Sequence, residues 1–396
     1  MKKSLSIITI MTGLSLAVFN VALLSPALPS VQNYYDVTSR NAQYIVIAFM
    51  IGYSLSQLSF GAICTILGYR KSMFIGIMIG IIGTIFCVFS WYAADYNFML
   101  LGRFIEGFGT SCGLTLCFAL ANELYEGKAA RNVTTYGLMA ASILPAFSNY
   151  IGGFLVFHLG WISCFELLLI CNFIAAFTVF LLPKTLSVRE NTKVSISKLI
   201  KNYNLAIKNP SIFLGAILYG LFLAIIYLTI ETLPFIGIGE LHLNVEKFGF
   251  LFLLSYLGYF TGTIISRLTT KKISAIQAIL FGIIISLLGS SFITINYFTG
   301  SLNSLTLFLG IYIIFIGVPL VVINGSNIAI SSHKDKANGS SMFNFIYSLF
   351  ALGAVFLPQF LSGNFEIILP SIIIGLSILG LYMWFKIKKI NNTLLN

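Results

Sequence analysis

Residues 273–295 read ISAIQAILFGIIISLLGSSFITI, an apolar run without a charged side chain that follows the pair Lys271-Lys272. A helix needs about 20 apolar residues to cross the hydrocarbon core of a bilayer, so this run predicts a membrane span. Similar runs recur along the whole chain, each bounded by charged and turn residues. We place spans near 6–31, 42–66, 73–93, 97–121, 133–157, 161–182, 211–236, 246–268, 273–295, 304–330, 339–361 and 366–386.

The overall composition supports the same fold class. Of 396 residues, 58% are hydrophobic and only 9% are charged. A soluble domain carries roughly 25% charged residues, because its surface must face water. The chain has too few charges to cover a soluble globule of its size. We therefore predict an all-α polytopic membrane protein with twelve transmembrane helices, in contact with the lipid bilayer.

The distribution of charge predicts the orientation of these spans. A net charge of +11 would suggest a nucleic-acid partner if the basic residues gathered on one face, but they separate the apolar runs instead. With the N-terminus in the cytosol, 20 of the 23 Lys and Arg residues fall on cytosolic segments. Cytosolic loops of membrane proteins carry this excess of basic residues. We predict a multi-pass protein of the cell inner (cytoplasmic) membrane, with both termini cytosolic and no nucleic-acid partner.

No pattern for catalysis or for a cofactor emerges from the sequence. The six cysteines show no C-x-x-C pair and no Cys/His spacing of a metal site. No glycine-rich stretch precedes the Lys-Ser/Thr pair of a phosphate-binding loop. The three histidines, His158, His242 and His333, lie far apart at loops on both sides of the membrane. We expect no metal, no cofactor and no enzymatic activity.

A polar stretch divides the spans into two equal sets. Residues 183–210 are rich in Lys and Arg and are flanked by Pro183 and Pro210, as suits a cytosolic linker. The predicted domains are a six-helix bundle at 1–182, the linker at 183–210, and a second six-helix bundle at 211–396.

The two halves share a local pattern at the end of their second span. Gly61 is followed nine residues later by Arg70-Lys71, and Gly262 is followed at the same distance by Lys271-Lys272. Equal span counts and this repeated pattern predict a duplicated transporter, in which two bundles move about a central site and give alternating access to the two sides.

Five stretches, in this order and spacing, are similar to a known family: SPALP at 25–29, residues 61–71, LLGRFIEGFG at 100–109, LYEGKAAR at 124–131, and the run from Pro145 through Gly152-Gly153 and Gly160-Trp161 to 182–186. In them the chain resembles the major facilitator superfamily and, within it, the Bcr/CflA-type drug:proton antiporters. The resemblance implies a gating loop that contains Gly61, Gly68, Arg70 and Lys71. It also implies that Arg103 takes part in proton coupling.

The chain departs from that family at positions that matter for coupling. Thr65 stands where the family has an acidic residue, and Ala22 aligns with the family's span-one aspartate. In span five the family's Gly-Pro pair reads Ser148-Asn149. Glu106 replaces a neutral glutamine, and this acid is a candidate to compensate for the missing aspartate.

The charged residues inside the predicted spans are the main mechanistic candidates. An arginine within a span costs about 2.5–3.5 kcal/mol on insertion scales, so Arg103 must face protein or water. Glu106 lies three residues further on and therefore on the same helix face. Either the two form a structural ion pair, or Glu106 exchanges a proton. Glu231, three residues before Pro234, either binds a cation or proton, or reaches external water at the membrane surface.

A set of uncharged polar side chains on several spans is expected to line a substrate cavity. Each could instead bridge two helices by hydrogen bonds. The candidates for substrate binding are Asn20, Gln57, Asn149, Tyr227, Asn324 and Asn327.

Together these features predict a proton-coupled secondary active transporter that exports a small drug-like molecule or metabolite. The residues leave open whether that substrate is a drug, a siderophore, a polyamine or a sugar. A proton-coupled uptake symporter is the alternative of the same class, and a membrane receptor that transports nothing is the alternative of another class. A membrane enzyme is less well supported, because it would need a His/Asp/Ser or metal constellation at the membrane face. A channel is less well supported, because it would need neither two matched halves nor a titratable pair. We expect the protein to act as a monomer on a small-molecule substrate and protons.

Overall fold

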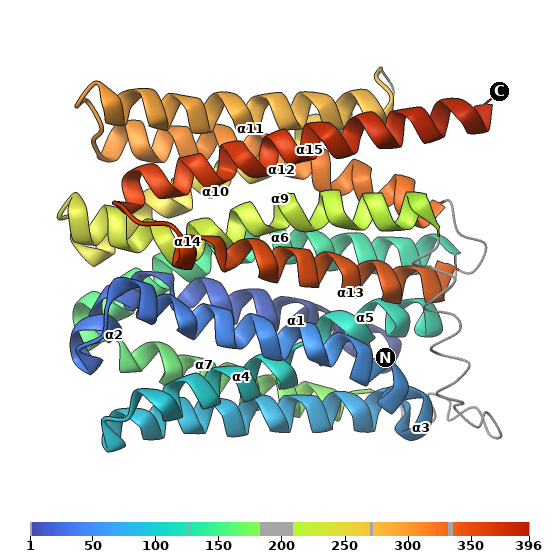
Figure 1. The fold of residues 1–396 in the computed structure, drawn as a ribbon. Helices are drawn as coiled ribbons and strands as arrows, with labels where there is room; N and C mark the ends of the chain where they lie inside the picture. Colours follow the sequence, from blue (N-terminus) through green and yellow to red (C-terminus); the bar gives the residue numbers. More distant parts are fainter. Residues whose placement is uncertain (1, 126, 183–208, 270–271, 332–335, 396) are drawn as a thin grey trace. The chain divides into compact units, whose positions relative to one another are not determined.

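A computed structural model describes residues 2–125, 127–182, 209–269, 272–331 and 336–395. The described residues fold almost entirely into helices (Figure 1). These residues contain no β-strand. The all-helical fold predicted from the apolar runs is therefore confirmed.

The chain divides into two compact units, Met1–Ile196 and Ser197–Asn396. The predicted linker at 183–210 lies outside the described residues, apart from Asn209 and Pro210. The first unit contains α1 (Lys2–Leu23), the 3-10 turn η1 (Ser25–Ala27), α2 (Leu28–Tyr35), α3 (Ser39–Ala93), α4 (Tyr96–Thr110), α5 (Cys112–Leu124), α6 (Gly127–Leu159) and α7 (Ile162–Val179). The second contains α9 (Pro210–Pro234), the π-helix η2 (Phe235–Glu240), α10 (Val245–Thr269), α11 (Ala275–Phe298), α12 (Ser304–Ser331), α13 (Lys336–Val355), α14 (Leu357–Phe360) and α15 (Phe365–Leu395).

Polar side chains define where several of these helices begin. Asp95 accepts a hydrogen bond from the backbone N–H of Asn97 at 2.8 Å and so starts α4. Asn209 does the same at α9, with Pro210 in the first turn where its missing N–H is not needed. At α11, Ser274 and Gln277 form a capping box. These helix starts follow from local sequence alone.

The helices agree with the predicted spans, with differences in the first unit. By length and composition, eight of the described helices are apolar enough to cross a membrane, or nine if the bent pair Ser6–Leu16 and Val18–Tyr35 is one span. Predicted spans 42–66 and 73–93 both lie in α3, which leaves helical geometry only at Gly68 (φ 77°, ψ 164°). Predicted span 97–121 is divided between α4 and α5.

The outer faces of the helices carry the apolar side chains that a lipid environment requires. On α7, Ile170, Phe173, Ile174 and Phe177 are 53–70% exposed. Exposed aromatic side chains in one row on a helix are unfavourable in water and favourable in hydrocarbon. The exposed face of α7 therefore agrees with a helix at the lipid boundary.

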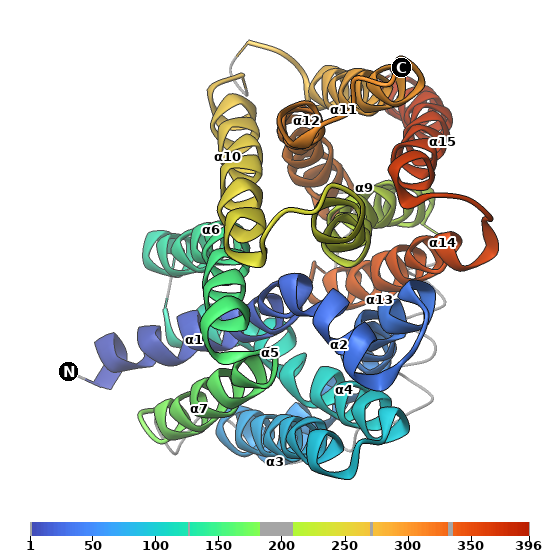
Figure 2. The ribbon, with the colours of Figure 1, turned by 90° about the vertical axis from the view of Figure 1, so that its left-hand side faces the viewer.

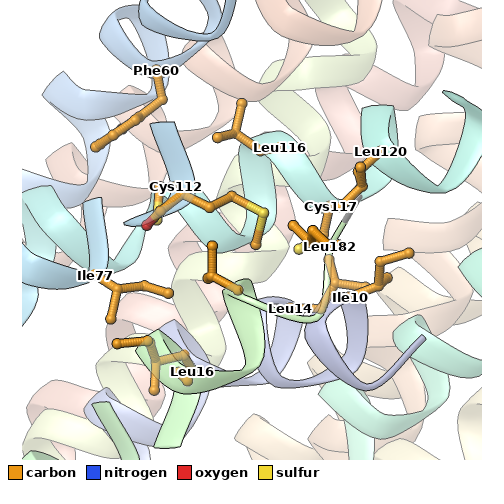
Figure 3. Packing of buried hydrophobic residues seen from close by; sticks show 14 of the residues in the cluster. Ile10, Leu14, Leu16, Phe60, Ile77, Cys112, Leu116, Cys117, Leu120 and Leu182 are labelled. Atoms are coloured by element: carbon orange, nitrogen blue, oxygen red, sulfur yellow. The ribbon is translucent and has the colours of Figure 1, made fainter. Parts of the chain in front are cut away.

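The core of the first unit lies among α1, α3, α5 and α7. Ile10 and Leu14 of α1 meet Phe60 and Ile77 of α3, and Figure 3 shows Cys112 and Cys117 of α5 among them. All six cysteines of the chain are free, and these two are fully buried. They act as small apolar side chains of the core, as predicted from their position in apolar runs.

In the second unit α9 is the central helix. It packs against α12, α13 and α15, and Figure 2, which looks along the helices, shows it among these three. The helices α10 and α11 pack against α12. Side chains on α9 are consequently enclosed on several sides, and the stretch from Leu228 of α9 to Gly237 of η2 is buried throughout.

Candidate functional site

The first unit contains a buried ion pair within α4. The Nη1 atom of Arg103 lies 2.5 Å from Oε2 of Glu106, and both side chains are fully buried. The spacing of three residues places both on one face of the helix, as the sequence predicted. The pair neutralises itself inside the unit.

The second carboxylate oxygen of Glu106 is also satisfied, by a neighbouring helix. The hydroxyl of Thr84 on α3 donates to Oε1 of Glu106 at 2.8 Å. Asn172 on α7 in turn donates from Nδ2 to the Thr84 hydroxyl at 3.1 Å. Thr84 and Asn172 are fully buried. The hydrogen bonds from Asn172 to Thr84 and from Thr84 to Glu106 therefore join α7, α3 and α4.

The guanidinium of Arg103 is held by α3 as well. Its Nε donates to the backbone carbonyl of Ile45 at 3.3 Å, and its Cζ lies 4.5 Å from the centroid of the Phe49 ring. Its Nη2 is buried and has no hydrogen-bond partner. A cation over an aromatic face is stabilised by the ring quadrupole, more strongly when water is excluded.

Glycines permit the close approach of α3 and α4 that this network needs. A Cβ atom on Gly83 would lie 2.3 Å from the backbone nitrogen of Glu106. A Cβ atom on Gly107 would lie 2.1 Å from the carbonyl oxygen of Phe49. Both distances are far below van der Waals contact, so any side chain at these two positions would push the helices apart.

The second unit contains a buried acid of a different kind. Glu231 on α9 is fully buried, and neither carboxylate oxygen has a hydrogen-bond partner. Of the helices packed against α9, α12 carries no Asp, Glu, Lys or Arg between Ser304 and Ser331. The charged residues of α15 lie at its first turn and from Lys386 onward, away from the middle of the helix. Because the side chain is fully buried, Glu231 does not reach external water as the interfacial alternative supposed.

The predicted polar candidates of the first unit are buried and only partly hydrogen-bonded. Asn20 donates to the carbonyl of Leu16 at 3.2 Å, and Asn149 donates to the carbonyl of Pro145 at 3.0 Å. The Oδ1 atoms of both asparagines have no partner. Gln57 accepts a 2.8 Å hydrogen bond from the Thr115 hydroxyl, whereas its Nε2 has no partner.

The predicted polar candidates of the second unit behave differently from one another. Asn324 donates to the hydroxyl of Ser266 on α10 at 3.1 Å and to the carbonyl of Leu320 at 2.8 Å. Asn324 therefore connects α12 to α10 by a hydrogen bond, which is the alternative to substrate binding for a polar residue in a span. Asn327, one turn further on, is exposed, and Tyr227 is half-buried.

The predicted gating loop is a turn within α3. Gly68 has a positive φ that glycine tolerates without strain, and Gly61 lies in the helical part before it. The guanidinium of Arg70 lies 5.4 Å from the centroid of the Phe180 ring, beside the end of α7. Lys71 is exposed.

Three functional candidates were not found from the sequence. Thr84 and Asn172 complete the Glu106 network, and Tyr256 on α10 has a buried hydroxyl without a partner. The one available signal was a lone asparagine in the apolar run 161–182. Residues that the structure describes show no cluster of three or more His, Cys, Asp or Glu side chains suited to a metal.

The structure has helices of membrane-spanning length, two compact helical units and buried charges within the helices. These are features of a polytopic membrane transport protein. The chain belongs to the Major Facilitator Superfamily, whose family model matches residues 10–385. Members of this superfamily are transporters of small molecules and not enzymes, and they act in a lipid bilayer.

Relatives and solved structures agree with this assignment. A protein of Rickettsia bellii described as an uncharacterized transporter is 26% identical over 69% of this chain and 67% of its own length. The drug efflux pump JefA of Mycobacterium tuberculosis is 24% identical over 41% of this chain and 32% of its own. Multidrug resistance protein D of Escherichia coli is 25% identical over 37% and 36%. The crystal structure of a D-xylose-proton symporter has the same fold, with a TM-score of 0.77, 12% identity, and coverage of 96% of this chain and 97% of that one.

Proposed function

We propose that this protein is a proton-coupled secondary active transporter that exports a small drug-like molecule or metabolite by alternating access. The observation that carries this proposal is Glu231, a fully buried carboxyl group with two unpartnered oxygens. The partial similarity to a drug efflux pump and to a multidrug resistance protein favours export of drug-like compounds.

The surroundings of Glu231 make its charge depend on an incoming ligand. An isolated carboxylate taken out of water loses several kcal/mol of solvation, which only a nearby cation or strong hydrogen bonds can replace. Glu231 has neither among the described residues, so in the proposed cycle it is the group that takes up a proton when no ligand is bound. Exposure to water or arrival of a cation would release that proton, and this is the step that couples proton movement to transport.

Glu106 is the weaker of the two candidate acids. Arg103 and Thr84 occupy both of its oxygens, so its charge is compensated inside the first unit. We propose that the Arg103–Glu106 pair fixes the positions of α3, α4 and α7, and that Glu231 carries the coupled proton.

The proposed subfamily, membrane location and orientation rest on sequence features. The motif order of the Bcr/CflA-type drug:proton antiporters favours that subfamily. The excess of basic residues on alternate loops favours a location in the inner membrane with both termini in the cytosol. We propose a functional monomer, because a single chain contains two compact helical units.

Transport driven by a pH gradient tests the proposal. Purified protein is reconstituted into liposomes with an acidic interior, the membrane potential is clamped with potassium and valinomycin, and ethidium is followed by fluorescence. Ethidium has a permanent charge, so a pH difference alone does not trap it. An antiporter accumulates ethidium in the acidic interior, and Glu231→Gln abolishes this accumulation. The matched control is Glu166→Gln, which removes an exposed carboxylate on α7 and leaves accumulation unchanged.

The same vesicles separate export from the alternative uptake symport. A symporter accumulates ethidium only when the exterior is acidic. Accumulation that needs no gradient in either direction, or full gradient-driven accumulation by Glu231→Gln, contradicts the proposal.

A further inference from the structure

In the second unit, a hydrogen bond joins the last part of α15 to the start of α11. The indole Nε1 of Trp384 on α15 donates to the backbone carbonyl of Ile276, in the first turn of α11, at 2.7 Å. The two helices pack against each other, and Figure 2 shows them side by side. Because the late part of one helix meets the start of the other, α11 and α15 are antiparallel.

Two lysines of α15 lie over aromatic rings next to this hydrogen bond. The Nζ atom of Lys388 is 5.1 Å from the centroid of the Trp384 ring, and that of Lys386 is 4.7 Å from the centroid of the Tyr382 ring. Both distances are within the reach of about 6 Å for a cation–π contact. Lys386 and Lys388 are exposed, so their ammonium groups remain accessible from outside the unit.

A third lysine reaches the same end of the unit from α11. Lys272 is exposed and lies four residues before Ile276, in the turn that leads from α10 into α11. Its backbone N–H donates to the carbonyl of Thr269 at 2.8 Å, which closes this turn. Lys388 follows Trp384 and Lys272 precedes Ile276 on antiparallel helices, so both lysines lie beyond the hydrogen bond in the same direction.

No acidic residue accompanies these lysines in the sequence. Asp and Glu are absent from residues 247–334 and from residues 367–396. The acids of the described second unit lie in the middle of α9, at the connection from α9 to α10 and at the start of α15, namely Glu231, Glu240, Glu246 and Glu366. Asp335 lies outside the described residues. The positive charge at this end is therefore left for a partner from outside the chain.

An apolar face of α15 leads up to the lysines. Ile378, Tyr382 and Phe385 are each more than half exposed, and their spacing of four and three residues places them on one face of the helix. Such a face is favourable in hydrocarbon and unfavourable in water. Tyrosine and tryptophan side chains are enriched at the level of the lipid headgroups. The Lys386 ammonium, which lies over the Tyr382 ring, is therefore at headgroup level.

The combination of charge and apolar surface indicates the chemistry of the partner. Ammonium groups donate strong, charge-assisted hydrogen bonds to phosphate oxygens. Basic clusters beside membrane spans attract anionic lipids. A soluble phosphate would contact the lysines but gain nothing from the apolar face. A zwitterionic lipid would fit the apolar face, but the lysines would repel the cation of its headgroup.

We infer that Lys272, Lys386 and Lys388 form a binding site for the headgroup of an anionic phospholipid, whose acyl chains lie along the exposed face of α15. Because one lysine precedes α11 and two belong to α15, a bound phosphate joins the ends of both helices. In the proposed orientation the site faces the inner leaflet. It goes beyond the proposed function, since it binds a lipid and uses neither buried acid.

Quenching of tryptophan fluorescence by brominated lipids tests the site locally. The chain has three tryptophans, so Trp91→Phe/Trp161→Phe leaves Trp384 as the only one. This full-length variant is reconstituted into phosphatidylcholine vesicles with a minor share of phosphatidylglycerol, and the bromine is carried either by the phosphatidylglycerol or by an equal amount of the phosphatidylcholine. We expect phosphatidylglycerol to be enriched beside Trp384 about 5-fold or more over its share of the bilayer, because one lysine near an anionic surface contributes about that factor.

Lysine variants in the same background separate a local site from general surface charge. Lys386→Gln/Lys388→Gln should remove most of the enrichment, whereas Lys386→Arg/Lys388→Arg should retain it. Two matched controls each remove one exposed lysine elsewhere: Lys247→Gln at the start of α10, at the opposite end of the unit, and Lys71→Gln in the first unit. Both should keep the enrichment of the parent variant.

A second measurement leaves all three tryptophans in place. Phosphatidylglycerol added to the protein in detergent should raise the melting temperature of the wild type and of Lys247→Gln more than phosphatidylcholine does. For Lys386→Gln/Lys388→Gln the two lipids should act equally.

Three results would overturn the inference. They are equal quenching by the two brominated lipids in the parent variant, full enrichment in Lys386→Gln/Lys388→Gln, and equal stabilisation of the wild type by the two lipids. Loss of enrichment in Lys71→Gln would also overturn it, because the attraction would then belong to the whole surface and not to the ends of α11 and α15.

Discussion

The ion pair of the first unit gives a quantitative prediction about stability. Glu106→Ala leaves the Arg103 guanidinium buried, with the carbonyl of Ile45 and the ring of Phe49 as its remaining contacts. Breaking a buried ion pair by removing one partner costs about 3–5 kcal/mol. At 1.4 kcal/mol for each factor of ten, the unfolding equilibrium constant should rise between about 100-fold and 4,000-fold.

A double-mutant cycle isolates the contribution of the pair. The double variant Arg103→Met/Glu106→Leu removes both charges and fills similar volumes. Its free energy of unfolding should lie within about 1–2 kcal/mol of the wild-type value, because apolar replacements of buried pairs are often close to neutral. The single variants of this cycle are Arg103→Met and Glu106→Leu, and each should lose about 3–5 kcal/mol because it leaves one buried charge unpaired. The coupling free energy, which is the sum of the two single losses minus the loss of the double variant, should therefore be about 4 kcal/mol or more.

The assay is equilibrium unfolding of the purified protein in mixed micelles, followed by circular dichroism. Glu166→Ala is the control, because this carboxylate is exposed and its loss should change stability by no more than about 0.5 kcal/mol. The reasoning is refuted if each single variant loses less than about 1 kcal/mol, or if the double variant loses the sum of the two single losses.

Two further predictions concern helix contacts. Gly107→Ala should lower the free energy of unfolding by about 1–3 kcal/mol, because the new methyl group meets the carbonyl of Phe49. The control Gly353→Ala should be neutral or slightly stabilising, because no atom lies within 4 Å of its new methyl group. Equal unfolding midpoints for the two variants would contradict this prediction. Asn324→Ala should lower the free energy of unfolding by about 0.5–1.5 kcal/mol through the lost hydrogen bond to Ser266. The double variant Asn324→Ala/Ser266→Ala should lose less than the sum of the two single losses, and additive losses in the same unfolding assay would show that the two side chains do not interact.

Sequence patterns predicted the helical fold, because scarce charge and long apolar runs are properties of composition and period. The position of Arg103 and Glu106 on the same face of one helix also follows from their spacing of three residues. In contrast, the contacts of Glu106 with Thr84 and of Thr84 with Asn172 depend on how three helices pack, and no local spacing encodes that.

The same limit applies to the second unit. The sequence marked Glu231 as an acid inside a span, with two readings, and only the packing of α12, α13 and α15 around α9 shows that the carboxyl group is fully buried. Tyr256 was one of nineteen tyrosines in the sequence, and nothing in its local sequence indicated that its buried hydroxyl would have no partner.

The central claim is that Glu231 carries the proton exchanged for substrate. Its most direct test is proton release on ligand binding, measured with a pH indicator when ethidium is added to purified protein in weakly buffered detergent solution. The account predicts proton release by the wild type and by Glu106→Gln, and none by Glu231→Gln. Undiminished release by Glu231→Gln, or loss of release only in Glu106→Gln, would contradict it.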